Sequence, residues 1–420
     1  MPQKNWPSKI RPPKIWINTG EISGDLHGAS LAKALWELEP NLRLLGMGGP
    51  AMRAAGVENL FQVEELSVMG LTEVLAKLPK ILRLLKSVEK RLELEKPDAL
   101  AVIDAPAFNF RLVRAACRLG IPVYYYISPK VWARNEKRVF FLKENVRRLI
   151  SILPFEVEFF AKYDLPVDYV GNPLLDALNL PELDKLSPIP GRVGLLPGSR
   201  RREVSSLMPE FATAARLLLE QKPELEFCCA VAPGLDEAYL RSFWDKSLPI
   251  AFFRPEERYQ AMRRCEMLFA ASGTAVLESA LIGTPTLIAY KLSRLTFALG
   301  KLLVKSPFIG LPNLIAGREI FPELLQAQAD GTNLARLALH WLEPERDGGA
   351  PGASYLTLKP KGGREGRLLA IGEVRRELAE LRQSLGGPGA TGRAAGIILD
   401  DLQKFQSVAR GKLSSDFPKK

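Results

Sequence analysis

The sequence predicts an α/β protein with two domains, each built on a parallel β-sheet with helices on both faces. The chain has 420 residues, which exceeds the usual size of one domain. Hydrophobic residues make up 47% of it and charged residues 25%, a composition typical of globular proteins. Short aliphatic runs alternate with helical stretches along most of the chain, which is the pattern of parallel sheets covered by helices.

The first domain is expected over residues 1–180. Five aliphatic runs predict strands at residues 14–18, 42–45, 99–103, 123–127 and 149–153. Helices are expected to begin near Gly24, Pro50, Leu71, Phe108 and Glu136. Strands and helices therefore alternate through the whole segment, as they do in a Rossmann-like domain.

A Pro-rich segment without periodicity, residues 181–191, is expected to link this domain to a second one at residues 192–342. There, strands are predicted at residues 193–196, 225–231, 251–253, 268–271 and 286–290. Residues 343–372 are interpreted as a Gly/Pro-rich insertion, and residues 373–420 as C-terminal helices with a tail. Two such Rossmann-like domains would face a central cleft, where open α/β sheets bind ligands at the carboxyl ends of their strands.

The composition restricts the function. A net charge of +11 favours anionic partners such as phosphates, nucleotides or an acidic membrane surface, and the 8% of aromatic residues do not alternate with basic ones as in a nucleic-acid groove. The four Cys lack metal-site spacing and only two His occur, so a carboxylate is the expected catalytic base. Without a signal-peptide pattern or an apolar run of about 18 residues, the protein is expected to be cytoplasmic, at most resting on a membrane.

Two glycine-containing loops follow predicted strands of the second domain and are candidate phosphate sites. Gly198, Ser199 and Arg200 stand between a strand and a helix, where backbone N–H groups, the helix dipole and a guanidinium can bind a phosphate. Ser272, Gly273 and Thr274 form a second loop of this kind, and Glu278 lies one helical turn further on, where it can accept hydrogen bonds from ribose hydroxyls. The alternative is a pair of tight turns with solvated charges.

In the first domain, Asp104 ends a buried strand and precedes a proline. A carboxylate there is suited to accept a proton from a substrate hydroxyl, although an N-cap is an equally good explanation. Glu21, Ser23 and Asp25 lie in a glycine loop that either binds sugar hydroxyls or is simply a turn and a cap. The nearby Gly46–Ala51 segment matches the dinucleotide pattern only weakly, because it follows the second strand and contains a proline.

Two segments, residues 71–94 and 291–307, combine apolar stripes with cations. The simpler interpretation is a pair of amphipathic helices packed on a sheet, and the functional one is docking to acidic lipid headgroups with apolar side chains for acyl chains. The residues expected to dock are Leu75, Leu78, Lys80, Leu82, Arg83, Arg294 and Lys301.

Together these motifs resemble lipid-A-disaccharide synthase, glycosyltransferase family 19, which has the two-domain GT-B fold. The likeness runs from about Ile15 to Leu325. Its main carriers are the motifs GEISGD (20–25), GMGGP (46–50), IDAP (103–106), ISPKVWA (127–133), LPFE (153–156), LPGSR (196–200), ASGTAVLE (271–278), LPNL (311–314) and AGRE (316–319).

The resemblance implies transfer of 2,3-diacylglucosamine from its UDP derivative to 2,3-diacylglucosamine 1-phosphate, giving the β-1,6 disaccharide and UDP, without metal or cofactor. It makes Asp104 the general base and Arg200 the donor-phosphate ligand. Glu278 would hold the ribose, and Ser272, Gly273, Thr274 and Asn313 would line the nucleotide site, with Arg318 and Glu319 behind them. It also implies work at the cytoplasmic face of the inner membrane, and the long C-terminal helices are compatible with a homodimer.

The chain departs from the family pattern at Tyr125 and Asn172, where many members have His, and this leaves Asp104 as the base candidate. Two other functions fit the same loops: a UDP-sugar epimerase and a nucleotide-sugar-binding protein without catalytic activity. An epimerase needs acid and base groups around one sugar and no lipid-binding surface, so the two amphipathic cationic segments favour the transferase.

Overall fold

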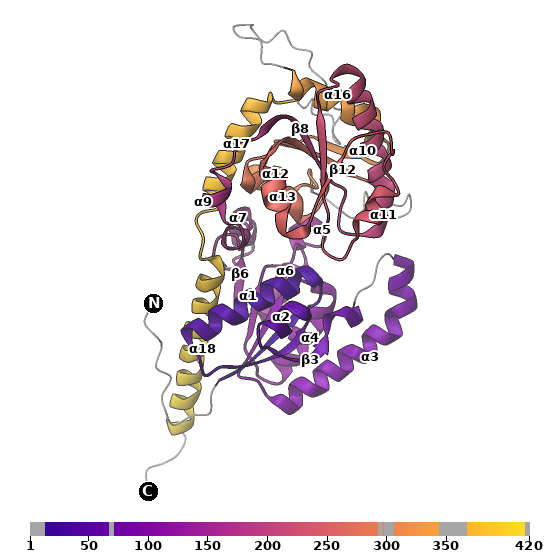
Figure 1. The fold of residues 1–420 in the computed structure, drawn as a ribbon. Coiled ribbons are helices and arrows are strands. Elements are labelled where there is room, and N and C mark those ends of the chain that lie inside the picture. Colours follow the sequence, from indigo (N-terminus) through magenta and orange to yellow (C-terminus); the bar gives the residue numbers. More distant parts are fainter. Residues whose placement is uncertain (1–12, 67–70, 293–296, 298–305, 344–367, 416–420) are drawn as a thin grey trace. The chain divides into compact units, whose positions relative to one another are not determined.

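The computed structural model describes residues 13–66, 71–292, 297, 306–343 and 368–415, and the side chains of Ile22, Ser23, Leu66, residues 71–77, Arg134 and residues 409–415 lie outside this description. The chain divides into two compact units (Figure 1). Unit 1 comprises residues 1–176 and 387–420, and unit 2 comprises residues 177–386.

Unit 1 contains a seven-stranded parallel sheet in the order β3-β2-β1-β4-β5-β6-β7. Its strands are β1 (Lys14–Thr19), β2 (Arg43–Gly48), β3 (Glu58–Gln62), β4 (Ala99–Ile103), β5 (Val123–Tyr126), β6 (Arg148–Ser151) and β7 (Val167–Tyr169). Its helices are α1 (Ile22–Leu38), α2 (Pro50–Ala54), α3 (Leu71–Glu95), α4 (Pro106–Arg118), α5 (Val131–Arg134), α6 (Arg138–Asn145), α7 (Phe155–Ala161), the boundary helix α8 (Leu174–Ala177) and α18 (Ala390–Ser415).

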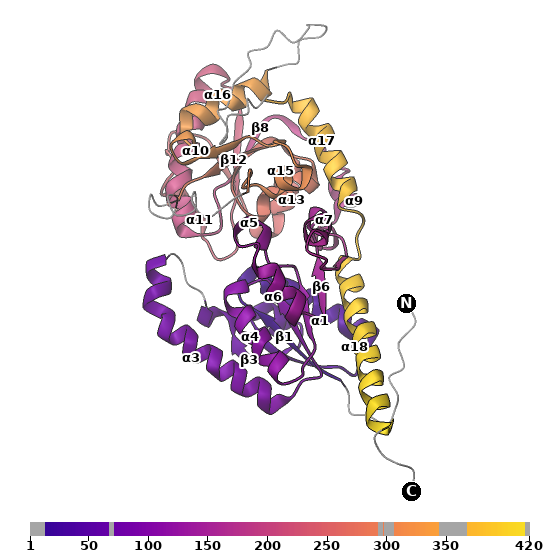
Figure 2. The same cartoon turned by 180° about the vertical axis from the view of Figure 1, so that it is seen from behind.

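Alternating side chains of the central strands divide between two hydrophobic cores, one on each face of the unit 1 sheet. Ile15 and Ile17 belong to the core that includes residues of α1 and α18, and Trp16 belongs to the core that includes residues of α3 and α4. Helix α18 lies along α1 in both views (Figures 1 and 2). The apolar face of α18 is buried on its own chain, so this helix offers no support for the homodimer with which the sequence is compatible.

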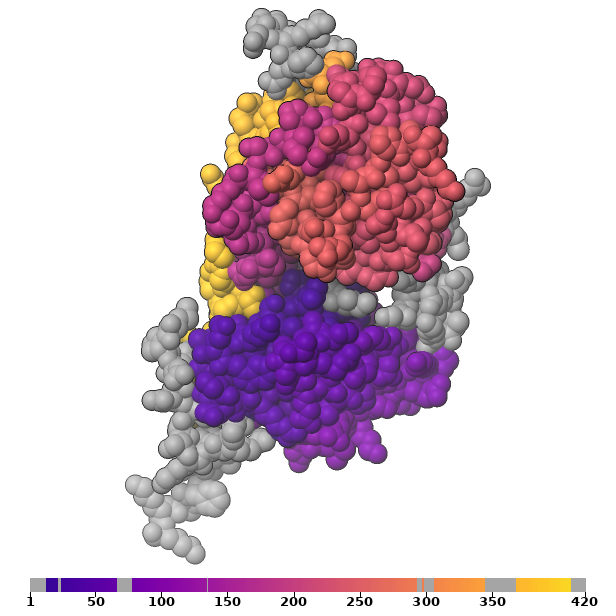
Figure 3. Space-filling view, viewed as in Figure 1, coloured from indigo at the N-terminus to yellow at the C-terminus, as the bar shows by residue number. Residues whose placement is uncertain are grey.

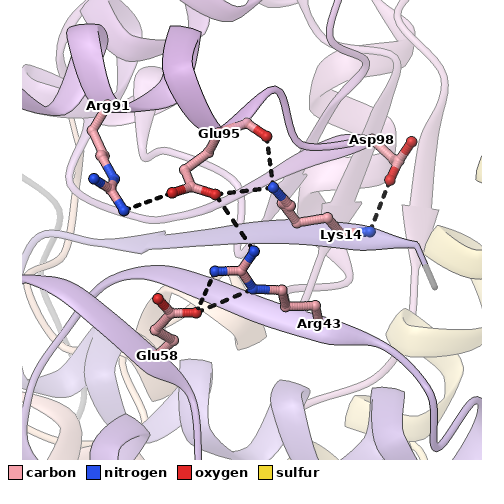
Figure 4. A network of polar contacts seen from close by, with 6 residues as sticks. All are labelled: Lys14, Arg43, Glu58, Arg91, Glu95 and Asp98. Atoms are coloured by element: carbon pink, nitrogen blue, oxygen red, sulfur yellow. Dashed lines mark hydrogen bonds and ion pairs between the residues drawn. The ribbon is translucent and has the colours of Figure 1, made fainter. Parts of the chain in front are cut away.

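A polar network joins the end of α3 to the first residues of β1, β2 and β3 (Figure 4). Glu95 accepts from the Lys14 ammonium at 2.9 Å and from the Arg91 guanidinium at 2.6 Å. Arg43 joins Glu95 at 3.7 Å to Glu58 at 2.8 Å. Because Lys14 and Glu95 are the least exposed members, at 11% and 12%, their pair is less screened by solvent than the outer pairs.

Unit 2 contains a six-stranded parallel sheet in the order β10-β9-β8-β11-β12-β13. Its strands are β8 (Ile189–Leu196), β9 (Glu226–Ala230), β10 (Ala251–Phe253), β11 (Cys265–Ala271), β12 (Thr286–Tyr290) and β13 (Glu323–Leu325). Its helices are α9 (Leu180–Leu183), α10 (Arg201–Gln221), α11 (Glu237–Arg241), α12 (Arg258–Arg263), α13 (Thr274–Ile282), α15 (Leu311–Ala316), α16 (Gly331–Leu342) and α17 (Ile371–Ser384). Residues in magenta to salmon form most of the visible surface of this unit (Figure 3).

The two-sheet α/β architecture predicted from the sequence is confirmed, with differences in detail. Strands β3, β7 and β13 were not predicted, because they are short edge or near-edge strands with mixed polar and apolar residues. Residues 181–191 are not an irregular linker throughout: α9 buries Leu180 and Leu183, and β8 already begins at Ile189. The last two helices also separate, since α17 packs on α13 in unit 2 and α18 belongs to unit 1. Most of the predicted insertion, residues 344–367, lies outside the described residues.

Candidate active site

The two candidate phosphate loops of unit 2 follow neighbouring strands. Leu196, near the end of β8, is in register with Ala270, near the end of β11. Because both strands run in the same direction, their following loops lie at the same edge of the sheet. The structure therefore brings the Gly198–Arg200 loop and the Ser272–Thr274 loop together, as a site for a diphosphate requires.

The Gly198–Arg200 loop holds a carboxylate from its own helix. The N–H groups of Ser199 and Arg200 donate to Glu203 Oε2 at 3.1 and 3.3 Å, and Arg200 Nη1 donates to Glu203 Oε1 at 3.2 Å. Gly198 has a φ of +108°, and a Cβ at this position would approach Glu203 Oε2 to 2.4 Å, so the loop requires glycine. Glu203 was not predicted as part of the site, although a Glu three residues into a helix is a recognisable capping signal.

The Ser272–Thr274 loop is open by comparison. Gly273 and Thr274 are exposed, and no side chain in the described part of the chain caps the start of α13. The first N–H groups of a helix point outward and carry the positive end of the helix dipole, so this start is suited to bind an anion.

Glu278 lies in α13, one turn beyond Thr274. Its Oε1 atom accepts a hydrogen bond from the Tyr259 hydroxyl at 3.2 Å, and the Arg258 guanidinium is 4.0 Å away. Burial raises the pKa of Glu278, while the charge of Arg258 and the Tyr259 hydrogen bond oppose that rise. Arg258 and Tyr259 belong to α12, and no motif in the sequence identified them.

The structure gives Asn313 a structural role rather than a place in the nucleotide site. Its side chain is fully buried: Oδ1 accepts from the N–H groups of Ile320 and Phe321, and Nδ2 donates to Phe321 O and to Glu323. All of its polar capacity is thus used inside unit 2.

The two residues expected behind the nucleotide site also have partners elsewhere. Arg318 forms an ion pair with Glu377 of α17 on the surface of unit 2. Glu319 accepts from the Glu323 N–H at 3.3 Å, and burial raises the pKa of Glu319. These contacts support the packing of unit 2, so we do not place Asn313, Arg318 or Glu319 in the nucleotide site.

In unit 1, Asp104 occupies a strained turn at the carboxyl end of β4. Asp104 and Ala105 both adopt left-handed backbone conformations, with φ values of +45° and +43°, which are unfavourable for residues other than glycine. Burial raises the pKa of Asp104, and the positive charge of Lys130 opposes that rise. A partly buried carboxylate with a raised pKa is the form expected of a general base.

A buried polar network holds this turn. Asn109 Nδ2 donates to the carbonyls of Ile103 and Asp104 at 3.2 and 2.7 Å, and its Oδ1 accepts from Asn18 at 2.8 Å. The hydroxyl of Tyr125, at one of the two family departures, donates to the Asp104 carbonyl at 2.7 Å. Such a network offsets the cost of the strained backbone and keeps Asp104 in place.

The other family departure, Asn172, caps the start of α8. It is buried, and its Oδ1 accepts from the Leu174 N–H at 3.0 Å.

Burial lowers the pKa of His27 to about 4, so this histidine is neutral at physiological pH.

The predicted sugar-binding loop is largely structural. The carboxylate of Asp25 is buried and accepts from the N–H groups of Gly49, Ala51 and Met52 at 2.6, 2.8 and 3.1 Å. Asp25 is therefore the cap of α2, which was the alternative open from the sequence, and it is not available to a sugar. Glu21 is exposed, and the side chain of Ser23 lies outside the described residues.

A further buried carboxylate, Glu156, which the sequence analysis did not place in the site, organises the loop that carries Lys130. Glu156 accepts from Ser128 Oγ at 2.5 Å and from Trp132 Nε1 at 2.9 Å, which fixes both ends of the segment that carries Lys130. Burial raises the pKa of Glu156, and these hydrogen bonds oppose that rise. The LPFE motif was the only signal for this residue.

The predicted lipid-docking residues can be placed only in part. Leu78 and Leu82 of α3 are 40% and 36% exposed, and Lys80 and Arg83 are exposed beside them. The side chain of Leu75, and Arg294 and Lys301 altogether, lie outside the described residues. Among the residues that are described, no helix is long and apolar enough to span a bilayer, and no group of three potential metal ligands occurs.

Solved structures with a similar fold include both sugar epimerases and glycosyltransferases. A UDP-GlcNAc 2-epimerase from Neisseria meningitidis, solved with UDP-GlcNAc, matches 93% of this chain and 100% of its own with a TM-score of 0.60 and 13% identity. MurG from Acinetobacter baumannii matches 93% of this chain and 100% of its own with a TM-score of 0.56 and 14% identity. At these identities the likeness concerns the fold, which is that of GT-B glycosyltransferases and UDP-GlcNAc 2-epimerases.

The sequence comparisons distinguish between the two groups. The family model for lipid-A-disaccharide synthetase matches residues 15–348. The lipid-A-disaccharide synthase of Trichlorobacter lovleyi is 38% identical over 409 residues, which cover 94% of this chain and 99% of that protein. That of Nitrosococcus oceani is 39% identical over 342 residues, covering 79% of this chain and 87% of that protein. The chain therefore belongs to the lipid-A-disaccharide synthase family, a family of glycosyltransferases.

Proposed function

We propose that this protein transfers 2,3-diacylglucosamine from its UDP derivative to the 6-hydroxyl of 2,3-diacylglucosamine 1-phosphate, giving a β-1,6 disaccharide and UDP. The observation that supports this most directly is the environment of Asp104, which is partly buried and has a strained backbone. Burial raises the pKa of its carboxyl group, and Asn109 and Tyr125 donate hydrogen bonds to its backbone carbonyl. A base fixed in this way is suited to deprotonate an alcohol.

In the proposed reaction, ionised Asp104 takes the proton of the acceptor 6-hydroxyl as its oxygen forms a bond to C1 of the donor sugar. The bond between C1 and the phosphate oxygen breaks, and the electron pair leaves with UDP, so the anomeric centre inverts. In unit 2, Arg200 and the open start of α13 stabilise the negative charge that develops on the leaving phosphate.

The donor site that we propose comprises the two loops and Glu278. Gly198, Ser199 and Arg200 contact one phosphate, and Ser272, Gly273 and Thr274 contact the other. This assignment requires Glu203 to release the loop N–H groups that it occupies in the free protein. Glu278 accepts a hydrogen bond from the ribose.

The experiment that tests this function measures UDP release from UDP-2,3-diacylglucosamine in detergent, with and without the acceptor and with EDTA. Release that requires the acceptor supports the transferase, and we expect it to survive EDTA because Arg200 and a helix dipole provide the positive charge. An epimerase would change the donor sugar without any acceptor, and a binding protein would release no UDP at all. Either result would contradict the proposal.

The Asp104→Asn variant tests the base. We expect kcat to fall by about 100- to 10,000-fold while UDP affinity stays unchanged. The wild-type rate should rise with pH through a pKa above the ordinary aspartate value, because burial raises the pKa of Asp104 and only the ionised form accepts a proton. Asp164→Asn, an exposed change in the same unit, is the matched control. Loss of UDP binding in Asp104→Asn would contradict the assignment.

We further propose that α3 rests on an anionic membrane surface at the cytoplasmic face of the inner membrane, since both substrates carry acyl chains. Leu78 and Leu82 would enter the headgroup region while Lys80 and Arg83 bind lipid phosphates. Replacing both leucines by serine should weaken binding to vesicles that contain anionic lipid, and added salt should do the same. Leu94→Ser, near the end of the same helix and 66% exposed, should have no effect. Binding that ignores salt and lipid charge would disprove this surface.

A further inference from the structure

Glu278 is held by two residues to which neither a motif nor the resemblance assigns a role. The Tyr259 hydroxyl donates to Glu278 Oε1 at 3.2 Å and itself accepts a hydrogen bond from the Arg258 guanidinium. The same guanidinium stacks on the Tyr259 ring, with Cζ 4.2 Å from the ring centre. Arg258, Tyr259 and Glu278 thus form a relay from α12 to α13.

The relay engages only one oxygen of Glu278. Among the described residues, Oε2 has no hydrogen-bond partner, and the side chain keeps 12% of its surface exposed. Glu278 lies four residues beyond Thr274, so it is about one turn, roughly 5 Å, from the open start of α13 on the same face. An anion bound at the helix start would therefore place its neighbouring group within reach of Oε2.

Burial alone would favour the neutral carboxyl group, which offers a poorer acceptor to a ligand hydroxyl. Arg258 and Tyr259 both act against this tendency, through a positive charge and a donated hydrogen bond. The hydrogen bond to Oε1 also restricts rotation of the carboxylate and so determines where Oε2 points.

We infer that Tyr259 and Arg258 are positioning residues that orient Glu278 toward the ribose of the bound nucleotide and thereby set a preference for ribonucleoside over deoxyribonucleoside diphosphates. This inference rests on the proposed function, because it requires the unit 2 loops to bind UDP. It adds two residues on a separate helix to the site and assigns them to discrimination rather than to transfer.

The test is a double-mutant cycle on UDP and on its 2′-deoxy and 3′-deoxy analogues, with dissociation constants measured by calorimetry. Wild-type protein should bind UDP about 10- to 100-fold more tightly than the analogue that lacks the recognised hydroxyl. Tyr259→Phe should reduce this preference about 5-fold or more by weakening UDP binding alone, since a charged hydrogen bond loses its orienting partner. Added to Glu278→Gln, Tyr259→Phe should cause no further loss of preference, because its effect passes through Glu278.

Tyr163→Phe is the matched control, since Tyr163 donates to Glu136 at 2.9 Å in unit 1 and the change removes the same kind of bond outside the site. It should leave every constant unchanged. Equal weakening of UDP and its analogues in Tyr259→Phe, or no change in preference, would overturn the inference. If wild-type protein binds UDP and both analogues equally, only the inference fails; if it binds none of them, the proposed function fails as well.

Discussion

Two glycine-containing turns, each leading from a strand to a helix of a parallel sheet, differ in whether a side chain occupies their N–H groups. The Gly46–Ala51 loop of unit 1 and the Ala271–Thr274 loop of unit 2 each join the end of a strand to the start of a helix. In unit 1 the Asp25 carboxylate already occupies the N–H groups of Gly49, Ala51 and Met52. In unit 2 no described side chain caps α13.

The comparison indicates that a glycine-containing turn is best suited to bind an anion when no side chain of the protein already occupies its N–H groups. Asp25 lies in the first turn of α1, and its carboxylate satisfies the very groups that a phosphate would need. The dinucleotide pattern in unit 1 is therefore a structural motif. The Gly198–Arg200 loop is intermediate, because the Glu203 that occupies it is less buried than Asp25.

The largest effect, on the free energy of unfolding, is expected from replacing Asp25, whose carboxylate occupies the N–H groups of the glycine turn in unit 1. Asp25→Ala should lower the free energy of unfolding by roughly 3–5 kcal/mol, because three N–H groups in a buried turn lose a charged acceptor. UDP affinity should not change, since the loop binds no nucleotide. Chemical denaturation measures the first quantity and calorimetry the second. Glu37→Ala, an exposed acid on the same helix α1, should change stability by about 0.5 kcal/mol or less. A variant that unfolds normally but loses UDP binding would reverse the comparison.

In unit 2, the carboxyl group of Glu323 also accepts hydrogen bonds from backbone N–H groups, and its effect on the free energy of unfolding should depend on pH. It accepts from the N–H groups of Ile309 and Gly310, both at 2.9 Å, but burial dominates and raises its pKa to about 7. Since the folded protein holds this proton more tightly than the unfolded chain, its contribution is complete below about pH 4.5 and is lost as the pH rises through about 7.

The free energy of unfolding of the wild-type protein should therefore fall between pH 5 and pH 8 by more than that of Glu323→Gln. The two decreases should differ by about 3 kcal/mol at most. Other groups titrate equally in both proteins, so the difference isolates Glu323. An identical pH dependence in the two proteins would show that its hydrogen bonds outweigh its burial.

A smaller effect is expected in the loop that we assign to the donor phosphate. Arg200→Ala should weaken UDP binding by about 10- to 100-fold, the value of a charge-assisted hydrogen bond. Stability should hardly change, because the Arg200 side chain is 55% exposed and its pair with Glu203 is screened by water. Arg202→Ala, an exposed arginine two residues further on, is the control. Unchanged UDP affinity in Arg200→Ala would remove this loop from the donor site.

The smallest effect is expected from replacing Glu203, whose carboxylate accepts from the N–H groups of the Gly198–Arg200 loop. Glu203→Gln should tighten UDP binding by about 2- to 5-fold, because a neutral side chain competes less well for the loop N–H groups. Glu220→Gln, an exposed change on the same helix, should have no effect. Weaker UDP binding in Glu203→Gln would mean that Glu203 prepares the loop for the ligand instead of competing with it.

The sequence predicts the central strands, and the position of Asp104 directly after one of them, because both are encoded locally by an aliphatic run followed by an acid. It does not distinguish Asp25 or Asn313 from ligand-binding residues. Both stand in polar loops of recognisable motifs, and only the tertiary structure shows that their hydrogen bonds are satisfied internally. The sequence does not reveal Tyr259 because no motif surrounds it. Only the packing of α12 beside α13 shows that its hydroxyl donates to Glu278.

Because α18 belongs to unit 1, the order in which the two units can fold during translation differs from their order along the chain. Helix α18 contributes Ala394, Ala395, Ile398, Leu399 and Leu402 to a core whose other buried residues lie between positions 15 and 170, so unit 2 is in effect inserted into unit 1. On the ribosome, unit 1 must wait for its last helix until all of unit 2 has been made, while unit 2 has its complete sequence by residue 386. The nascent chain should therefore complete the unit that we propose to bind the nucleotide before it completes the unit that contains Asp104.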